Sequence, residues 1–307
     1  MTILIKNISH LVTMDDTGSE YRDGWILVDG RSIRALGDGE PPPPEKGEAR
    51  TQIDACGAMA LPGMINTHHH LYQTFQRAVP RVQDAKLFDW LVGLYEIWRE
   101  LTPDDVRISA QVGLGELLLT GCTTIADHFY VFPKGQSPHL LDETIDAARQ
   151  LGVRFHPSRG SMSRGRSQGG LPPDDVVQSP DVILSDSQRV VERYHDADRF
   201  SMCRLALAPC SPFSVTDDLL AESAKLARSL GVRLHTHLAE TRDEETFCLQ
   251  THGCRPLAYM EKVGWLGSDV WYAHGVYLND AELSLMASTG TGIAHCPTSN
   301  LRLGSGM

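Results

Sequence analysis

The 307-residue sequence predicts an α/β fold, a (β/α)8 TIM-type barrel with a small all-β module before it. Three observations carry this prediction. Short strand-like runs and a proline-rich loop occupy residues 1–58, strand and helix patterns alternate through residues 59–307, and histidines gather where several strands are expected to end. Barrel proteins place their functional side chains at the C-terminal ends of the strands.

Residues 1–58 read as short β-strands. The stretch "WILVDGRSIRAL" consists of two apolar runs around Asp29-Gly30, which predicts a hairpin. Pro41 to Pro44 cannot continue a strand ladder, so we expect an exposed loop there. These features predict a small β module.

From Met59 the pattern changes to strands that alternate with helices, as in parallel βαβ units. Thr102 and Pro103 begin one helix and Gly121 ends it, while Thr216 and Gly231 bound another. The seven expected strands lie within residues 63–68, 122–129, 153–158, 203–209, 232–239, 270–275 and 291–297.

These units can close in two ways, as an open doubly wound sheet or as a barrel. No G-x-G-x-x-G follows the early strands, so the sign of a dinucleotide-binding sheet is absent. The histidines at several strand ends favour the barrel. A barrel needs eight strands, and the sequence ends at "NLRLGSGM" after the seventh. A seven-strand variant or an open sheet is one interpretation; we expect instead a chain truncated before its eighth strand.

The composition narrows the possible functions. Twenty-eight basic against 39 acidic residues give a net charge of −11, so a phosphate-tracking nucleic-acid surface is not expected. No apolar run reaches signal-peptide or membrane-spanning length, which predicts a cytoplasmic protein without a membrane partner. The seven cysteines are scattered without a C-x-x-C, which favours reduced thiols.

The stretch "NTHHHLYQ" contains three consecutive histidines. If a strand ends there, alternation turns His68 and His70 toward the barrel mouth and His69 away from it. Two neutral imidazoles on one strand can bind a divalent ion together with a third ligand. The alternative for this motif alone is a solvated loop without a metal.

Later strand ends add to this pattern. In "VRLHTHLAE", His237 lies nearer the end of its strand than His235, so His237 is the better ligand and His235 is expected to be deeper and structural. Glu240 follows at the mouth, where a carboxyl group can move protons, although a helix-start acid is the plainer alternative. His274 ends the sixth strand and, taken alone, would more often be a core residue.

Competing motifs are absent or misplaced. The sequence contains neither H-E-x-x-H nor the H-x-E and P-C-x-x-C pair of small zinc deaminases. Gly165 to Gly169, "GRSQG", matches G-x-S-x-G but lies in a basic glycine-rich stretch without the strand and helix of a nucleophile elbow. We interpret it as a mobile loop near the site, and a serine nucleophile at Ser167 is the alternative.

The motifs "LPGMINTHHHLYQ", "HTHLAET", "WYAHG" and "AHCPTSN" resemble the aminohydrolase and deaminase branch of the amidohydrolase superfamily, over essentially the whole chain. Within that branch, "LFDWL" and "LAPCSPFSV" resemble the 8-oxoguanine deaminases. The resemblance implies that residues 1–58 form the N-terminal part of a β-sandwich domain. Residues 59–307 would form a metal-dependent barrel that is incomplete at its C-terminus.

The resemblance also assigns roles by position. Its metal-binding histidines fall on His68, His70 and His237, and its proton-shuttling acid falls on Glu240. His274 corresponds to its sixth-strand histidine, which contacts the attacking water and the substrate's carbonyl or leaving group. The family's substrate contacts fall on Gln73, Trp90 and Cys210. Trp90 has the alternative of a helix anchor, and Cys210 that of a buried small hydrophobe.

The implied activity is metal-dependent hydrolytic deamination of a purine-like heterocycle, 8-oxoguanine first, with release of ammonia. The resemblance implies one divalent metal, zinc before iron, a small-molecule substrate and a homo-oligomer. An s-triazine of the hydroxyatrazine type and guanine are alternative substrates. A metal-free scaffold or binding protein is the alternative of another class, because the family's eighth-strand aspartate lies outside this sequence.

Overall fold

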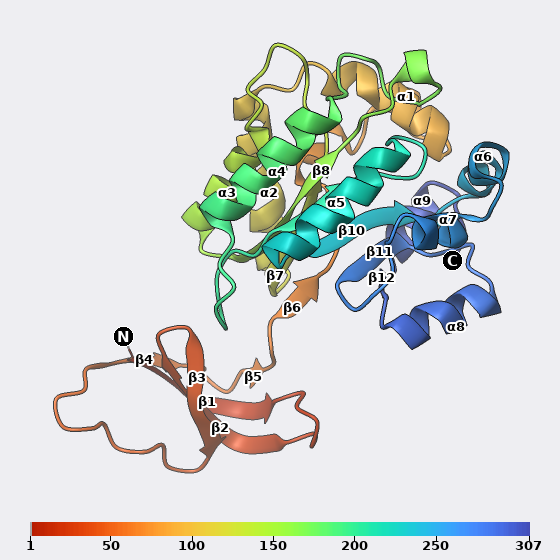
Figure 1. The fold of residues 1–307 in the computed structure, drawn as a ribbon. Coiled ribbons are helices and arrows are strands. Elements are labelled where there is room, and N and C mark those ends of the chain that lie inside the picture. Colours follow the sequence, from red (N-terminus) through yellow and green to blue (C-terminus); the bar gives the residue numbers. More distant parts are fainter. Residues whose placement is uncertain (1) are drawn as a thin grey trace. The chain divides into compact units, whose positions relative to one another are not determined.

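The computed structural model describes residues 2–307, which form two compact units (Figure 1). Among the described residues, one unit comprises 2–64 with Asp198–Phe200, and the other comprises Ile65–Ala197 with Ser201–Met307. The sequence placed the change near residue 59, and the division into a sandwich portion and a barrel stays a prediction.

The first unit is a small β-sheet in the order β3-β2-β1-β4, with β5 pairing with β1. The expected hairpin forms around Gly30, whose φ is 57°, with Asp29 opposite Ser32. Leu4, Trp25 and Leu27 make its small buried cluster. The strands are β1 (Thr2–Val12), β2 (Glu20–Asp29), β3 (Ser32–Asp38), β4 (Arg50–Asp54) and β5 (Met59–Ala60).

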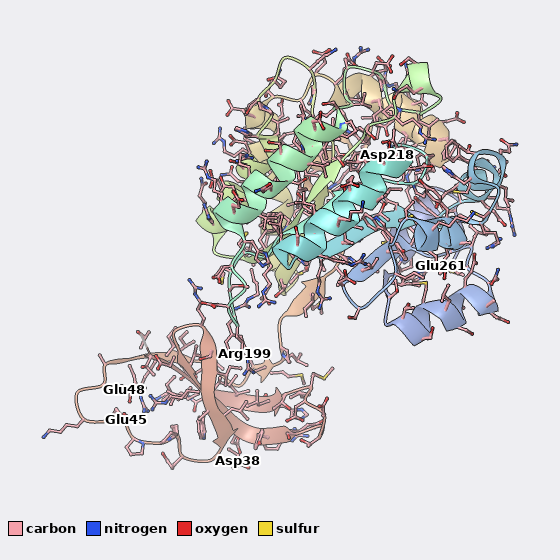
Figure 2. All side chains as sticks on the ribbon, in the orientation of Figure 1. Asp38, Glu45, Glu48, Arg199, Asp218 and Glu261 are labelled. Atoms are coloured by element: carbon pink, nitrogen blue, oxygen red, sulfur yellow. The ribbon has the colours of Figure 1, made fainter. Side chains whose placement is uncertain are left out.

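The proline-rich segment of this unit lies between β3 and β4, outside any strand, as expected. Charged side chains anchor the segment that follows it. Arg34 lies 3.2 Å from a carboxylate oxygen of Glu45 and 3.3 Å from one of Glu48, both labelled in Figure 2. Such exposed ion pairs hold a loop only weakly, because water screens them.

The second unit contains a seven-stranded sheet in the order β12-β11-β10-β9-β8-β7-β6. Neighbouring strands from β7 to β12 pair in parallel. The sheet curls into a half-barrel covered by helices (Figure 1), which confirms the predicted fold class. The strands are β6 (Met64–Asn66), β7 (Cys122–Phe129), β8 (Arg154–Ser161), β9 (Ala206–Pro209), β10 (Arg233–Leu238), β11 (Val270–His274) and β12 (Gly292–Ala294).

Helices alternate with these strands and supply most of the apolar core. The α-helices are α1 (Leu87–Trp98), α2 (Pro103–Leu119), α3 (Leu140–Leu151), α4 (Pro180–Tyr194), α5 (Asp217–Leu230), α6 (Arg242–His252), α7 (Pro256–Lys262), α8 (Asp280–Thr289) and α9 (Pro297–Arg302). Short 3-10 turns are η1 (Leu71–Gln76), η2 (Pro80–Val82) and η3 (Arg166–Gln168). Within residues 2–307, none of the helices combines the length and the apolar character needed to cross a bilayer.

The predicted helix ends are observed, with one difference in their chemistry. Thr102 and Asp105 form a reciprocal capping box at the start of α2. Thr216 precedes α5, but its side chain makes no cap bond; its hydroxyl lies 3.2 Å from that of Ser163 on another loop. Gly231 ends α5 with φ 69°, a conformation that glycine adopts without strain.

Two further expectations are resolved by the fold. Strand β6 ends at Asn66, so His68 and His70 lie in the segment after the strand and not within it. The "GRSQG" stretch forms η3, in which Ser167 donates its hydroxyl to Asp174 at 3.0 Å. It lacks the strand-turn-helix geometry of a nucleophile elbow, so the serine-nucleophile alternative has no structural support.

Candidate metal centre and catalytic pocket

Four histidine rings converge at the C-terminal ends of the half-barrel strands. His68 and His70 follow β6, His128 lies on β7 and His237 lies on β10. Their donor atoms all lie within 4.8 Å of one another. Strands β7, β8 and β9 separate β6 from β10 in the sheet, so the curl of the sheet brings these side chains together.

Backbone carbonyls define the protonation of two of these rings. Nδ1 of His70 lies 2.7 Å from the carbonyl oxygen of His128, and Nδ1 of His237 lies 2.6 Å from that of Cys210. A carbonyl oxygen only accepts hydrogen bonds, so each Nδ1 carries the proton. In each neutral ring, Nε2 therefore holds an unshared electron pair.

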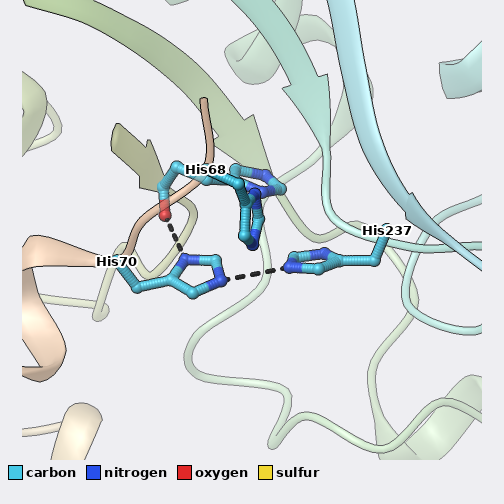
Figure 3. A group of neighbouring side chains, drawn as sticks. His68, His70 and His237 are labelled. Atoms are coloured by element: carbon cyan, nitrogen blue, oxygen red, sulfur yellow. Dashed lines mark hydrogen bonds between the residues drawn. The ribbon is translucent and has the colours of Figure 1, made fainter. Parts of the chain in front are cut away.

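These two Nε2 atoms face one another at 3.1 Å (Figure 3). A hydrogen bond between them would require one charged ring. Burial is the main cause that lowers the pKa of both His70 and His237 well below the ordinary value, and the neighbouring histidines lower it further. Two unprotonated nitrogens at this distance repel each other unless a cation lies beside both. The donor set thus fits a divalent metal that prefers imidazole, such as zinc or iron.

His68 presents a third nitrogen to the same place. Its Nδ1 lies 2.7 Å from Nε2 of His235, which leaves Nε2 of His68 for the metal. Burial and the nearby histidines lower the pKa of His68 as well. The ring of His69 is outside the group, although its backbone oxygen accepts the N–H of His128 at 2.7 Å.

His128 was not predicted from the sequence. Its Nε2 donates to the carbonyl oxygen of Ala208 at 2.8 Å, and its Nδ1 is buried without a hydrogen-bond partner among residues 2–307. A fourth unshared pair therefore lies beside the other three. The signal that could have found it was present, because "ADHF" places a histidine at the end of a predicted strand as "WYAHG" does.

Glu240 follows β10 and is only 4% exposed. Its Oε2 lies 3.5 Å from Nε2 of His274, and its Oε1 has no partner in the described part of the chain. Burial raises the pKa of Glu240 to about 8. The carboxyl group therefore holds a proton at neutral pH, as a general acid must.

The backbone around Glu240 is held by a second buried carboxyl group. Glu244, fully buried at the start of α6, accepts the N–H of Ala239 at 2.8 Å and that of Glu240 at 3.0 Å. Ala239 has φ 52°, an uncommon conformation for a residue with a side chain. The hydrogen bonds from the backbone N–H groups of Ala239 and Glu240 to the Glu244 carboxyl group stabilise this turn. The turn thereby sets the orientation of the Glu240 side chain.

His274 ends β11 with φ 78°, again in the left-handed region. Its Nδ1 lies 2.7 Å from Oδ1 of Asn300, a fully buried residue of α9. Burial lowers the pKa of His274 to about 4, so the ring is neutral. With the Nδ1 proton donated to Asn300, Nε2 can accept a hydrogen bond from the protonated Glu240.

All of the predicted site residues line one cavity, which has a volume of about 760 Å³. The amide of Gln73 donates to the hydroxyl of Tyr72 at 3.2 Å, which leaves its oxygen free to accept. Trp90 both lines the cavity and packs edge to face on Trp98, so it is a wall residue and a helix anchor at once. The predicted residues in the cavity wall are His68, His70, Gln73, Trp90, Cys210, His237, Glu240 and His274.

Cys210 lies in this wall with its thiol 3.9 Å from Nδ1 of His237. Burial raises the pKa of the thiol to about 12, so the sulfur is uncharged. A neutral thiol is a poor metal ligand. Cys210 therefore lines the cavity with an uncharged side chain and orients His237 through its carbonyl oxygen.

Residues 59–307 match the amidohydrolase family. The chain is 47% identical to an 8-oxoguanine deaminase from Pseudomonas aeruginosa over 290 residues, covering 94% of this chain and 64% of that enzyme. It is 38% identical to a hydroxydechloroatrazine ethylaminohydrolase from a Pseudomonas species, covering 96% of this chain and 63% of that enzyme. The chain thus spans somewhat less than two thirds of the length of both relatives.

A solved structure agrees with the fold. Atrazine chlorohydrolase from Arthrobacter aurescens, complexed with zinc, superposes with a TM-score of 0.92 at 36% identity. The match covers 99% of this chain and 68% of that enzyme.

Proposed function

This chain belongs to the amidohydrolase family, and from that premise we propose that it catalyses the hydrolytic deamination of a purine-like heterocycle, 8-oxoguanine first. One observation carries the proposal: three unprotonated histidine nitrogens and a buried, protonated carboxyl group line the same cavity. The 47% identity to an 8-oxoguanine deaminase supports this choice of ring.

The Nε2 atoms of His68, His70 and His237 would hold one divalent ion. When bound, this ion supplies the Lewis acidity that makes water nucleophilic at neutral pH. We propose zinc, because the donor set suits it and the Arthrobacter enzyme was crystallised with zinc. Iron has compatible ligand preferences.

Glu240 moves the protons, and His274 orients the reacting groups. Water adds to the ring carbon that carries the amino group while Glu240 gives its proton to the adjacent ring nitrogen, and the Glu240 carboxylate then takes up the proton that the added water loses. His274, neutral and with Nε2 free, accepts a hydrogen bond from the added oxygen or the departing amine. When the carbon–nitrogen bond breaks, the proton of the added hydroxyl passes to the amino group by way of the Glu240 carboxylate. The carbon then keeps the oxygen as a carbonyl group, and the amino group leaves as ammonia.

The rest of the cavity selects and orients the ring. The amide nitrogen of Gln73 donates a hydrogen bond to the hydroxyl of Tyr72. The amide oxygen of Gln73 can therefore accept a hydrogen bond from an N–H of the substrate ring. Trp90 offers a flat aromatic wall, and Cys210 offers a small uncharged contact. An aromatic wall with a few polar groups is typical of sites for flat heterocycles.

The second candidate is an aminohydrolase of hydroxylated s-triazines. The 38% identity to the hydroxydechloroatrazine enzyme favours it, and both reactions replace a ring amine with oxygen. A homo-oligomer and a cytoplasmic location stay predictions, and a metal-free scaffold or binding protein stays the alternative of another class.

The test is metal content together with ammonia release from the purified chain, using 8-oxoguanine, guanine, isoguanine and hydroxylated triazines in parallel. We expect about one metal per chain and turnover on 8-oxoguanine, with His68→Ala and His237→Ala losing both. His139→Ala, an exposed histidine at the start of α3, is the control. If the chain turned over a triazine but none of the purines, the proposed substrate would change from a purine to a triazine. Absence of metal and of turnover would contradict the proposal.

A further inference from the structure

His235 lies one layer below the candidate metal ligands and uses both of its ring nitrogens. It points into the interior of the half-barrel from β10 and is 1% exposed. Its Nδ1 lies 2.9 Å from the carbonyl oxygen of Trp271, and its Nε2 lies 2.7 Å from Nδ1 of His68. It therefore connects the backbone of β11 to the ring of a candidate ligand 167 positions away in the sequence.

The protons in this chain of contacts have one consistent arrangement. The Trp271 carbonyl oxygen only accepts, so Nδ1 of His235 carries a proton. A neutral imidazole that is protonated on Nδ1 has its unshared pair on Nε2, and Nε2 of His235 is the atom that lies 2.7 Å from Nδ1 of His68. That nitrogen can only accept from His68, so the proton of His68 is on Nδ1.

The consequence for His68 is chemical as well as geometric. A neutral histidine coordinates a metal through its unprotonated nitrogen, so the tautomer decides which nitrogen is available. With the proton on Nδ1, the unshared pair of His68 is on Nε2. Carbonyl oxygens perform this task for His70 and His237, whereas His68 depends on a side chain.

We propose that His235 is a positioning residue of the metal centre, which holds the proton of His68 on Nδ1 and so directs Nε2 to the metal. This inference rests on the metal site of the proposed function. It gives a role to a histidine that the sequence predicted to be deeper and structural.

Trp271 holds this arrangement from two sides. Its ring stacks on that of His235, with centroids 4.3 Å apart and an angle of 13° between the ring planes. Its carbonyl oxygen accepts a hydrogen bond from Nδ1–H of His235. Its indole N–H donates to the carbonyl oxygen of Thr67 at 3.2 Å, directly before His68. The same residue thus restrains both the backbone of His68 and the partner of its ring.

His156 provides a matched control. It is a partly buried neutral histidine on β8 that also stacks on Trp271, with centroids 5.3 Å apart and planes 28° apart. Burial lowers its pKa to about 4. Its aromatic contact is with Trp271 and not with a candidate ligand.

The experiment compares zinc affinity in His235→Phe, His235→Gln and His156→Phe variants of the full chain, by competition with a chromogenic chelator. Phenylalanine can keep the stack on Trp271 but cannot accept from His68. Glutamine places an acceptor near the position of Nε2. We expect H235F to bind zinc about 10–100-fold more weakly, H235Q to recover most of the affinity, and H156F to match the wild type.

A second measurement uses the wild type and so does not depend on whether H235F folds. Long-range proton–nitrogen NMR spectra of the metal-free chain report the tautomer of His68, with the signal assigned by its loss in H68A. The Nδ1–H form is expected. An Nε2–H form, or an H235F variant that folds and binds zinc as tightly as the wild type, would overturn the inference. A wild type that binds no zinc would instead contradict the proposed function.

Discussion

The protonation of Glu240 depends on its surroundings more than on its chemistry. Burial raises its pKa to about 8, and the nearby Ser305 hydroxyl lowers it by a smaller amount. Its Oε1 has no partner within residues 2–307. The charged form is therefore poorly solvated, and the neutral form predominates at pH 7.

This raised pKa makes stability depend on pH. Between the ordinary value of 4.5 and about 8, the folded chain holds a proton that the unfolded chain has lost. The contribution to the free energy of unfolding is complete below pH 4.5 and disappears as the pH rises through 8. Glu240→Gln lacks this loss, so the unfolding temperature of E240Q should rise relative to the wild type from about pH 5 to about pH 9 in the metal-free chain.

The control for this measurement is Glu222→Gln, at an exposed carboxylate on α5. Thermal unfolding is followed by circular dichroism in the presence of a chelator, because a bound cation would shift the titration of Glu240. A difference between E240Q and the wild type that does not change with pH would contradict the raised pKa.

Cys210 leads to a second prediction about a single residue. Its backbone oxygen, not its thiol, holds His237, and the thiol is neutral. Cys210→Ala should therefore bind zinc as the wild type does and raise KM for the heterocycle. Cys248→Ala removes a buried thiol of α6 outside the cavity wall and should leave KM unchanged. Loss of zinc in C210A would mean that the sulfur is a ligand.

Among the secondary-structure elements, the approach of β8 to the end of β7 is unusually close. A Cβ atom added at Gly160 of β8 would meet the carbonyl oxygen of Phe129 first, and would lie 2.7 Å from Cβ of Tyr130 and 2.8 Å from Cδ2 of His128. These atoms belong to the strand end that carries one of the clustered histidines. The pocket therefore depends on a residue without a side chain on the neighbouring strand.

Gly160→Ala is expected to lower the free energy of unfolding by about 1–3 kcal/mol, because backbone atoms must move to make room. Gly115→Ala is the control. Gly115 lies inside α2 with open space around its missing side chain, so alanine there should add about 0.5–1 kcal/mol. Urea unfolding of both variants measures these effects, and equal stability of G160A and the wild type would contradict the clash.

At the scale of the whole molecule, the candidate metal joins distant parts of one sheet. His68 and His70 follow the edge strand β6, and His237 lies on β10, with three strands between them in the sheet. A bound ion would therefore tie one edge of the half-barrel to its middle. Its binding energy would add directly to the stability of the fold.

Removal of the metal should accordingly lower the unfolding temperature. Free zinc at 100 times its Kd would stabilise the folded chain by about 2.7 kcal/mol. We expect a chelator to destabilise the wild type and H139A equally, and to have no effect on H237A. Calorimetry with and without chelator measures the unfolding temperatures. If the chelator does not change the unfolding temperature of the wild type, the proposal that a bound metal links β6 to β10 is contradicted.

Local patterns in the sequence determined the order of strands and helices, the helix ends at Thr102 and Gly231, and the histidines of the two H-x-H motifs. Hydrophobic periodicity, capping and glycine conformations act over a few residues, so they can be read from a short stretch. The family resemblance predicted that eight residues from different parts of the chain belong to one site. In the structure all eight line the same cavity.

Only the tertiary structure decided how these side chains support one another. The contacts of His68 with His235, of His274 with Asn300 and of His128 with the other histidines join strands and helices far apart in the chain. Which nitrogen carries a proton depends on the acceptor that the curled sheet places beside it. No local pattern encodes that acceptor, because it comes from another strand whose position follows from the packing of the whole sheet.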